Sequence, residues 1–190
     1  MDHLHAIDYS LGELRQVVAG LDGTVMDDAT NCEPWTVRQL ASHALNNQLL
    51  WAGLVTGRQL VSVEDTMGAV AIDGDLAQVA DGVAAQAAAM WRSDGVLGAI
   101  HATPLGELPG SVVTNFAVID ALAHAWDLSA SVGRPIEFYA PEIPWVAEVV
   151  AATCTDAARD HGLIKPATEP PLDATDTERL MALAGRTIPR

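Results

Sequence analysis

Three side chains of this sequence, His43, Asp120 and His124, have the types and the spacing of a divalent-metal site. Asp120 and His124 are four residues apart, so on one helix they project from the same face, one turn apart. A carboxylate and an imidazole that project together form half of a metal site, and His43 on another helix can complete it. Three protein ligands leave a coordination position open, which indicates chemistry at the metal rather than structural support.

The same spacing is also compatible with a site that holds no metal. Asp120 could hydrogen-bond His124 within one helix, and His43 could be a core histidine, because Asp/His pairs at this spacing are frequent in helices. From spacing alone this alternative is the simpler one. A cation would nevertheless satisfy all three side chains at once, and an unpaired carboxylate buried in a helical bundle costs several kcal/mol.

Further side chains near these motifs have two interpretations each. Asn47 and Arg38 are the secondary candidates for binding a cofactor or substrate, but an ordinary helix amide and a surface ion pair are expected. Arg134 could likewise meet an acidic substrate, and a surface ion pair is again expected. Asp127 could accept a hydrogen bond from His43, although a solvated carboxylate is expected. Cys32 has no neighbour in the sequence that would lower the pKa of its thiol, so a packing role is expected rather than a nucleophilic one.

Composition limits the classes of protein to which the chain can belong. Its 190 residues fit one domain, or one domain with an appended segment, and a hydrophobic content of 49% is enough for a full core. The net charge of −15 repels nucleic-acid backbones and anionic lipids, so neither is expected as a partner. Two cysteines without CxxC spacing, no secretory signal and no membrane-spanning run favour a cytoplasmic protein.

The periodicity of apolar residues predicts an all-α fold. Four long helices with compatible apolar stripes form a four-helix bundle, two further helices follow it, and residues 96–108 are irregular or form a short extended excursion. We expect residues 1–165 to form the metal-binding bundle and residues 166–190 an extended, proline-stiffened linker with a short C-terminal helix packed on the bundle. The predicted helices span residues 2–21, 36–57, 75–93, 111–132, 141–161 and 176–183.

Three motifs resemble one family, in the same order along the chain. Residues 34–43, PWTVRQLASH, and residues 120–128, DALAHAWDL, resemble the metal motifs of the DinB/YfiT-like superfamily. More narrowly, they resemble the mycothiol-dependent maleylpyruvate isomerase metal-binding domain family. Residues 176–186, DTERLMALAGR, resemble the C-terminal signature of a short, mostly uncharacterised metal-binding branch.

The resemblance implies a DinB/YfiT-like four-helix bundle whose divalent metal is held by His43, Asp120 and His124. Zinc is the first expectation for the metal, and nickel, iron and manganese are the alternatives. In the isomerase the acid position of this motif resembles a Glu, whereas this chain has Asp120, whose side chain is one methylene shorter. The metal is therefore expected closer to that helix.

The expected function is that of a metal-dependent enzyme that uses a low-molecular-weight thiol, mycothiol by resemblance. The thiolate would attack a small electrophilic substrate and yield an S-conjugate, as a transferase, or an isomer after loss of the thiol. Two alternatives stay open: a non-catalytic metal-binding or stress-related protein, and a metal-dependent hydrolase. Self-association into a homodimer through an apolar helix face is a further expectation.

Overall fold

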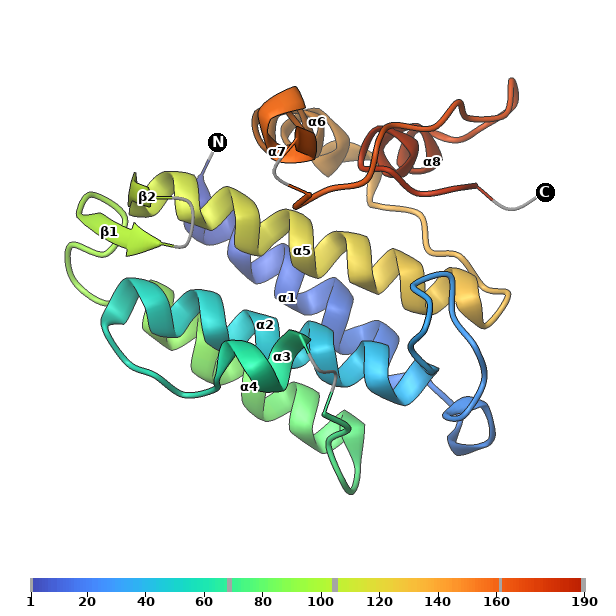
Figure 1. Ribbon diagram of the computed structural model, residues 1–190, viewed down its shortest axis with the longest axis horizontal. Helices are drawn as coiled ribbons and strands as arrows, with labels where there is room; N and C mark the ends of the chain where they lie inside the picture. The colour runs from blue at the N-terminus through green and yellow to red at the C-terminus, as the bar shows by residue number, and fades with distance from the viewer. Residues whose placement is uncertain (1, 68–69, 104–105, 161, 189–190) are drawn as a thin grey trace.

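Four long helices form the body of the structure, a computed structural model that describes residues 2–67, 70–103, 106–160 and 162–188. They are α1 (His3–Ala19), α2 (Val37–Thr56), α4 (Leu76–Trp91) and α5 (Gly110–Ser131). Both α1 and α2 pack against α4 and against α5, so the four form a closed bundle (Figure 1). The predicted all-α class and four-helix bundle are confirmed.

Local signals in the sequence determine where these helices begin and end. Thr36 caps α2 by accepting a hydrogen bond from the Gln39 amide, and the Gln39 side chain accepts one from the Thr36 amide in return. Gly57 ends α2 in the left-handed conformation, with φ 68°. Asp2 and Asp75 cap α1 and α4 through their carboxylates. The start of α2 is therefore fixed, and with it the position of His43 two turns further on.

Short elements connect the long helices. The five-residue helix α3 (Val63–Met67) packs against α2 and lies between two of the predicted helices, where the sequence predicts none. The single-turn 3₁₀ helices η1 (Gly23–Val25) and η2 (Ala140–Glu142) lie in other connections. The segment predicted as irregular or extended contains an antiparallel hairpin of β1 (Ile100–Thr103) and β2 (Gly106–Pro109), which leads directly into α5.

The C-terminal helices cover the side of α5 that faces away from the bundle (Figure 1). They are α6 (Ile143–Thr153), α7 (Asp156–Asp160) and α8 (Asp176–Leu183). Apolar side chains of α6 and α8 belong to the same buried cluster as Leu122 and Trp126 of α5. Because α5 is enclosed by the bundle and by this layer, it is apolar around most of its circumference, unlike a surface helix.

The predicted helix over residues 141–161 is wrong as a single element. The helix breaks after Thr153, and the Thr155 hydroxyl then accepts a hydrogen bond from the Ala158 amide at the start of α7. A hydroxyl that caps a new helix competes with continuation of the old one. The end predicted at His161 lies outside the described residues. None of the helices in the described ranges has the length and apolarity needed to cross a lipid bilayer.

Glycine at the start of α5 allows a close approach that any side chain would block. A Cβ at Gly110 would lie 2.0 Å from the Val96 carbonyl oxygen, whereas a Cβ at Gly12 in α1 would meet nothing within 4 Å. We therefore expect Gly110→Ala to lower the free energy of unfolding by about 1–3 kcal/mol. The control Gly12→Ala should raise it by about 0.5–1 kcal/mol. Urea denaturation measures both, and equal effects at the two positions would contradict this view of the α5 start.

Candidate metal centre

The three predicted ligands come together where α2 faces α5. One ligand atom from each of His43, Asp120 and His124 lies within 4.8 Å of the other two. His124 Nε2 is 3.6 Å from Asp120 Oδ1, too long for a hydrogen bond. Two ligands at about 2.0–2.2 Å from a tetrahedral zinc ion are separated by about 3.3–3.6 Å. The spacing therefore fits a shared cation better than the alternative in which Asp120 hydrogen-bonds His124.

Both imidazoles are held by their Nδ1 atoms. His43 Nδ1 lies 2.7 Å from the Thr66 carbonyl oxygen in α3, and His124 Nδ1 lies 3.1 Å from Asp127 Oδ2. An acceptor at Nδ1 places the proton there and leaves the lone pair on Nε2, the arrangement found at metal-ligating histidines. Burial, and then the neighbouring His124, lowers the pKa of His43, which favours its neutral, ligating form.

Two amides of α2 hold the Asp120 carboxylate. Asn47 Nδ2 donates to Asp120 Oδ1 at 3.0 Å, and Gln48 Nε2 donates to Oδ2 at 3.0 Å. Asn47 Nδ2 also lies 3.2 Å from His43 Nε2, so one amide group contacts two of the proposed ligands. Gln48 is fully buried. Asn47 is thus a buried amide inside the centre, whereas Gln48 carries no distinguishing signal in the sequence.

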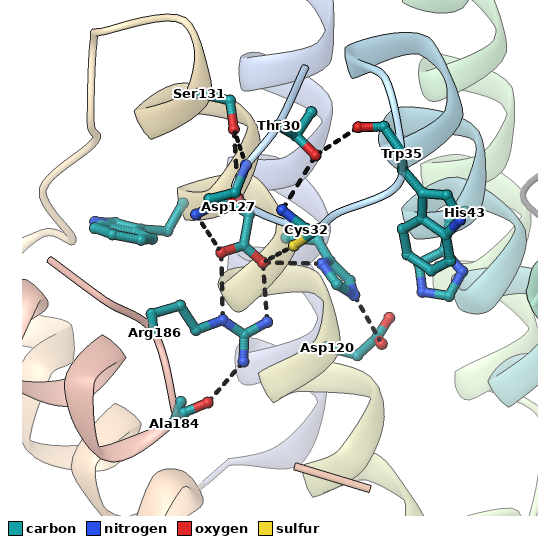
Figure 2. Close-up of polar contacts among 12 residues, drawn as sticks. Thr30, Cys32, Trp35, His43, Asp120, Asp127, Ser131, Ala184 and Arg186 are labelled. Carbon is teal, nitrogen blue, oxygen red and sulfur yellow. Dashed lines mark hydrogen bonds and ion pairs between the residues drawn. The ribbon is translucent and has the colours of Figure 1, made fainter. Parts of the chain in front are cut away.

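A network of charged and polar side chains surrounds the Asp127 carboxylate (Figure 2). Asp127 has no solvent exposure, and both its oxygens accept from the Arg186 guanidinium, at 3.3 and 2.9 Å. Asn31 Nδ2 and Cys32 Sγ also donate hydrogen bonds to the Asp127 carboxylate. Burial opposes ionisation, but Arg186 and the hydrogen bond from His124 outweigh it and hold the pKa of Asp127 well below its usual range.

The sequence expectation for Asp127 is therefore wrong. From the sequence, Asp127 is expected to be a solvated carboxylate or else an acceptor for His43. The structure shows instead a buried carboxylate that accepts a hydrogen bond from His124. The i, i+3 spacing of His124 and Asp127 is a local signal that points to this pair. Arg186 lies 59 residues further along the chain, and no pattern in the sequence connects it with Asp127.

A second cluster has ligand-like geometry but unsuitable chemistry. Cys32, His124 and Asp127 also bring ligand atoms within 4.8 Å of one another. Burial, and then the charge of Asp127, raises the pKa of the Cys32 thiol to about 12, which opposes formation of the thiolate that a metal would bind. The Arg186 guanidinium already supplies the positive charge that Asp127 requires. Cys32 is thus a packed hydrogen-bond donor, in agreement with the expectation from the sequence.

The centre is largely enclosed but not sealed. The side chains of His124 and Asp120 are 12% and 17% exposed, and the Trp35 ring lies against His43 with the ring centroids 4.3 Å apart. Three ligands from the chain would leave one coordination position of a tetrahedral ion for an external group. The donor set of two imidazoles and one carboxylate suits zinc and similar divalent ions.

The guanidinium groups of Arg38 and Arg134, the two arginines considered for substrate binding, contact backbone carbonyls. Arg38 donates to the carbonyl oxygens of Ile72 and Gly74, and Arg134 donates to that of Gly20. The expectation of surface ion pairs is wrong, since both guanidinium groups donate hydrogen bonds to backbone carbonyl oxygens instead. Each arginine joins two segments distant in sequence, which indicates a structural role.

Comparisons with known proteins identify a family model and relatives that this chain resembles. The family model described as mycothiol maleylpyruvate isomerase N-terminal domain matches residues 9–129. Two uncharacterized proteins of Mycobacterium tuberculosis, one from each of two strains, are 28% identical over 193 residues, covering 99% of this chain and 100% of theirs.

Solved structures match the fold. The crystal structure of the mycothiol-dependent maleylpyruvate isomerase superposes with a TM-score of 0.67 at 18% identity, over 85% of this chain and 71% of that one. A histidine-to-alanine mutant of that isomerase gives 0.66 over the same shares. At this identity the structural match supports the fold alone.

The raised pKa of Cys32 predicts an unreactive thiol. At pH 8 a thiol with a pKa of about 12 has roughly 1,000-fold less thiolate than one at the ordinary 9.0. In a Cys154→Ser background, iodoacetamide should therefore label folded protein about that much more slowly than protein in urea. Mass spectrometry follows the labelling. Rapid labelling of the folded chain at pH 8 would contradict this prediction and make Cys32 a candidate nucleophile.

Proposed function

The chain belongs to the mycothiol maleylpyruvate isomerase N-terminal domain family, and from that premise we propose that it is a metal-dependent enzyme that uses a low-molecular-weight thiol. The thiol is mycothiol, and the reaction is transfer of the thiol to a small electrophile or thiol-assisted isomerisation of it. His43, Asp120 and His124 hold the metal, with zinc as the first choice. The proposal includes a cytoplasmic location, because two unbridged cysteines suit a reducing compartment.

One observation carries the proposal: both imidazoles have Nδ1 engaged by an acceptor while one ligand atom of each lies close to the same carboxylate. A core histidine needs only satisfied hydrogen bonds, and it does not need a second imidazole and a carboxylate beside it. Two separate helices supply this combination, and the buried neighbours Thr66 and Asp127 maintain it. Such support from outside the ligand set is typical of metal centres.

The residues of the chain have separate parts in the proposed chemistry. A divalent cation bound by the three ligands would supply an open position at which the pKa of a thiol is lowered. Thr66 and Asp127 fix the ring orientations, and Asn47 and Gln48 fix the carboxylate. The Trp35 ring covers His43 and limits water on that side. None of the three ligands is the base in this scheme.

Removal of a ligand should remove the metal and the activity together. For His43→Ala we expect metal content to fall at least about tenfold, and chelator-sensitive conjugation of thiol to a generic electrophile to fall with it. Elemental analysis and a thiol-consumption assay measure the two. His5→Ala is the matched control, since the His5 side chain is half exposed and pairs with Glu142 away from the centre. Equal metal content in His43→Ala and in the wild type would exclude His43 as a ligand.

The same experiment separates the proposed enzyme from the alternative functions. Bound metal without thiol-dependent turnover would favour a non-catalytic metal-binding protein. Chelator-sensitive hydrolysis of an ester without added thiol would favour a hydrolase, since the same open position can activate water.

Metal binding should also stabilise the fold, because a ligand that binds only the folded state shifts the unfolding equilibrium. At a free zinc concentration about 100 times its Kd, the free energy of unfolding should rise by about 2.7 kcal/mol. Chemical denaturation with added zinc and with EDTA measures the difference. His43→Ala should show little of it, and a zinc effect that persists in this variant would locate the binding elsewhere.

A further inference from the structure

The C-terminal segment reaches the metal centre through an unbroken series of contacts (Figure 2). Arg186 donates to both oxygens of Asp127, and Asp127 Oδ2 lies 3.1 Å from Nδ1 of His124. Arg186 follows α8 and lies beyond the segment that matches the family model. The support for one proposed ligand therefore comes from a part of the chain outside the bundle.

Arg186 determines where the Asp127 carboxylate can lie. The Asp127 side chain has no solvent exposure, so water cannot replace a lost partner. A guanidinium binds both carboxylate oxygens in a fixed plane, whereas an ammonium group is a point charge. This two-point contact holds Asp127 Oδ2 toward His124 Nδ1. Without it only the weaker contacts of Asn31, Cys32 and His124 would hold the carboxylate, and the acceptor that orients the His124 ring would be less well fixed.

The backbone delivers Arg186 to this position with little freedom. Gly185 has φ 84°, and a Cβ there would lie 2.6 Å from the Lys165 carbonyl oxygen. The Arg186 amide donates to the Met181 carbonyl, and its guanidinium also donates to that of Ala184. The end of α8, the turn at Gly185 and the linker are thus packed as one unit.

We propose that Arg186 is a positioning residue of the metal centre, acting through Asp127 on His124, and that metal binding and docking of the C-terminal segment stabilise each other. The inference rests on the proposed function, because it requires the His43, Asp120 and His124 site to bind a metal. Coupling between two binding events is reciprocal. A metal that binds more weakly when the C-terminal segment is undocked must make undocking rarer by the same factor.

Titration with Co²⁺, followed by its visible absorption, tests the positioning role. We expect Arg186→Met to weaken Co²⁺ binding about 10–100-fold and Arg186→Lys to weaken it less. Arg159→Met is the matched control: Arg159 donates to the carbonyls of Lys165 and Leu183 and so holds the same segment without touching Asp127. Its Co²⁺ affinity should stay near that of the wild type even if its melting temperature falls. If Arg186→Met does not fold, the comparison of Co²⁺ affinity between Arg186→Lys and Arg159→Met tests the positioning role.

Hydrogen exchange tests the reciprocal effect without reference to activity. In the wild type, Co²⁺ should slow amide exchange in residues 180–186 by about the factor by which Arg186→Met weakens binding. Equal loss of affinity in Arg159→Met and Arg186→Met would reduce Arg186 to a structural tether, and unchanged affinity in both Arg186 variants would overturn the coupling. A wild-type chain that does not bind Co²⁺ would overturn the proposed function, and the coupling with it.

Discussion

The Asp127 carboxylate, buried without solvent and balanced by Arg186, is the constraint on which the rest of this structure depends. Breaking a buried ion pair by removing one partner typically costs about 3–5 kcal/mol, because the remaining charge has no water to stabilise it. The pair joins α5, the loop that carries Asn31 and Cys32, and the segment after α8. Three parts of the chain that are distant in sequence are thereby fixed relative to His124.

The bundle supplies the complementary constraint on the opposite side of the centre. The reciprocal cap between Thr36 and Gln39 fixes the start of α2, and packing of α2 against α5 brings His43 to Asp120. A slip of either helix by one turn would move its side chains by about 5.4 Å along the axis. This shift exceeds the 4.8 Å within which the three ligand atoms now lie. The position of the centre thus follows from helix ends and packing, and its orientation follows from the buried acceptors.

The features of this structure that can be predicted from the sequence are those that depend on local residue spacing and on recognisable motifs. The helical class, the bundle and the meeting of His43 with Asp120 and His124 follow from periodicity, from i, i+4 spacing and from the resemblance of the motifs. The roles of Thr66, Gln48 and Arg186 depend on contacts between segments far apart in the chain, and no periodic pattern encodes those. The sequence does not predict the break after Thr153, because the apolar stripe continues past it, whereas the Thr155 hydroxyl caps a new helix there.

The position of the Asn47 amide has a consequence for the proposed affinity of the site. Its N–H groups reach His43 Nε2 and Asp120 Oδ1, two of the lone pairs that a cation would take. The amide therefore ties α2 to α5 at the point where His43 and Asp120 meet, and it satisfies these buried acceptors within the protein. A cation bound as we propose would compete with this amide for the same lone pairs, so the side chain of residue 47 would influence how tightly the site holds its ion.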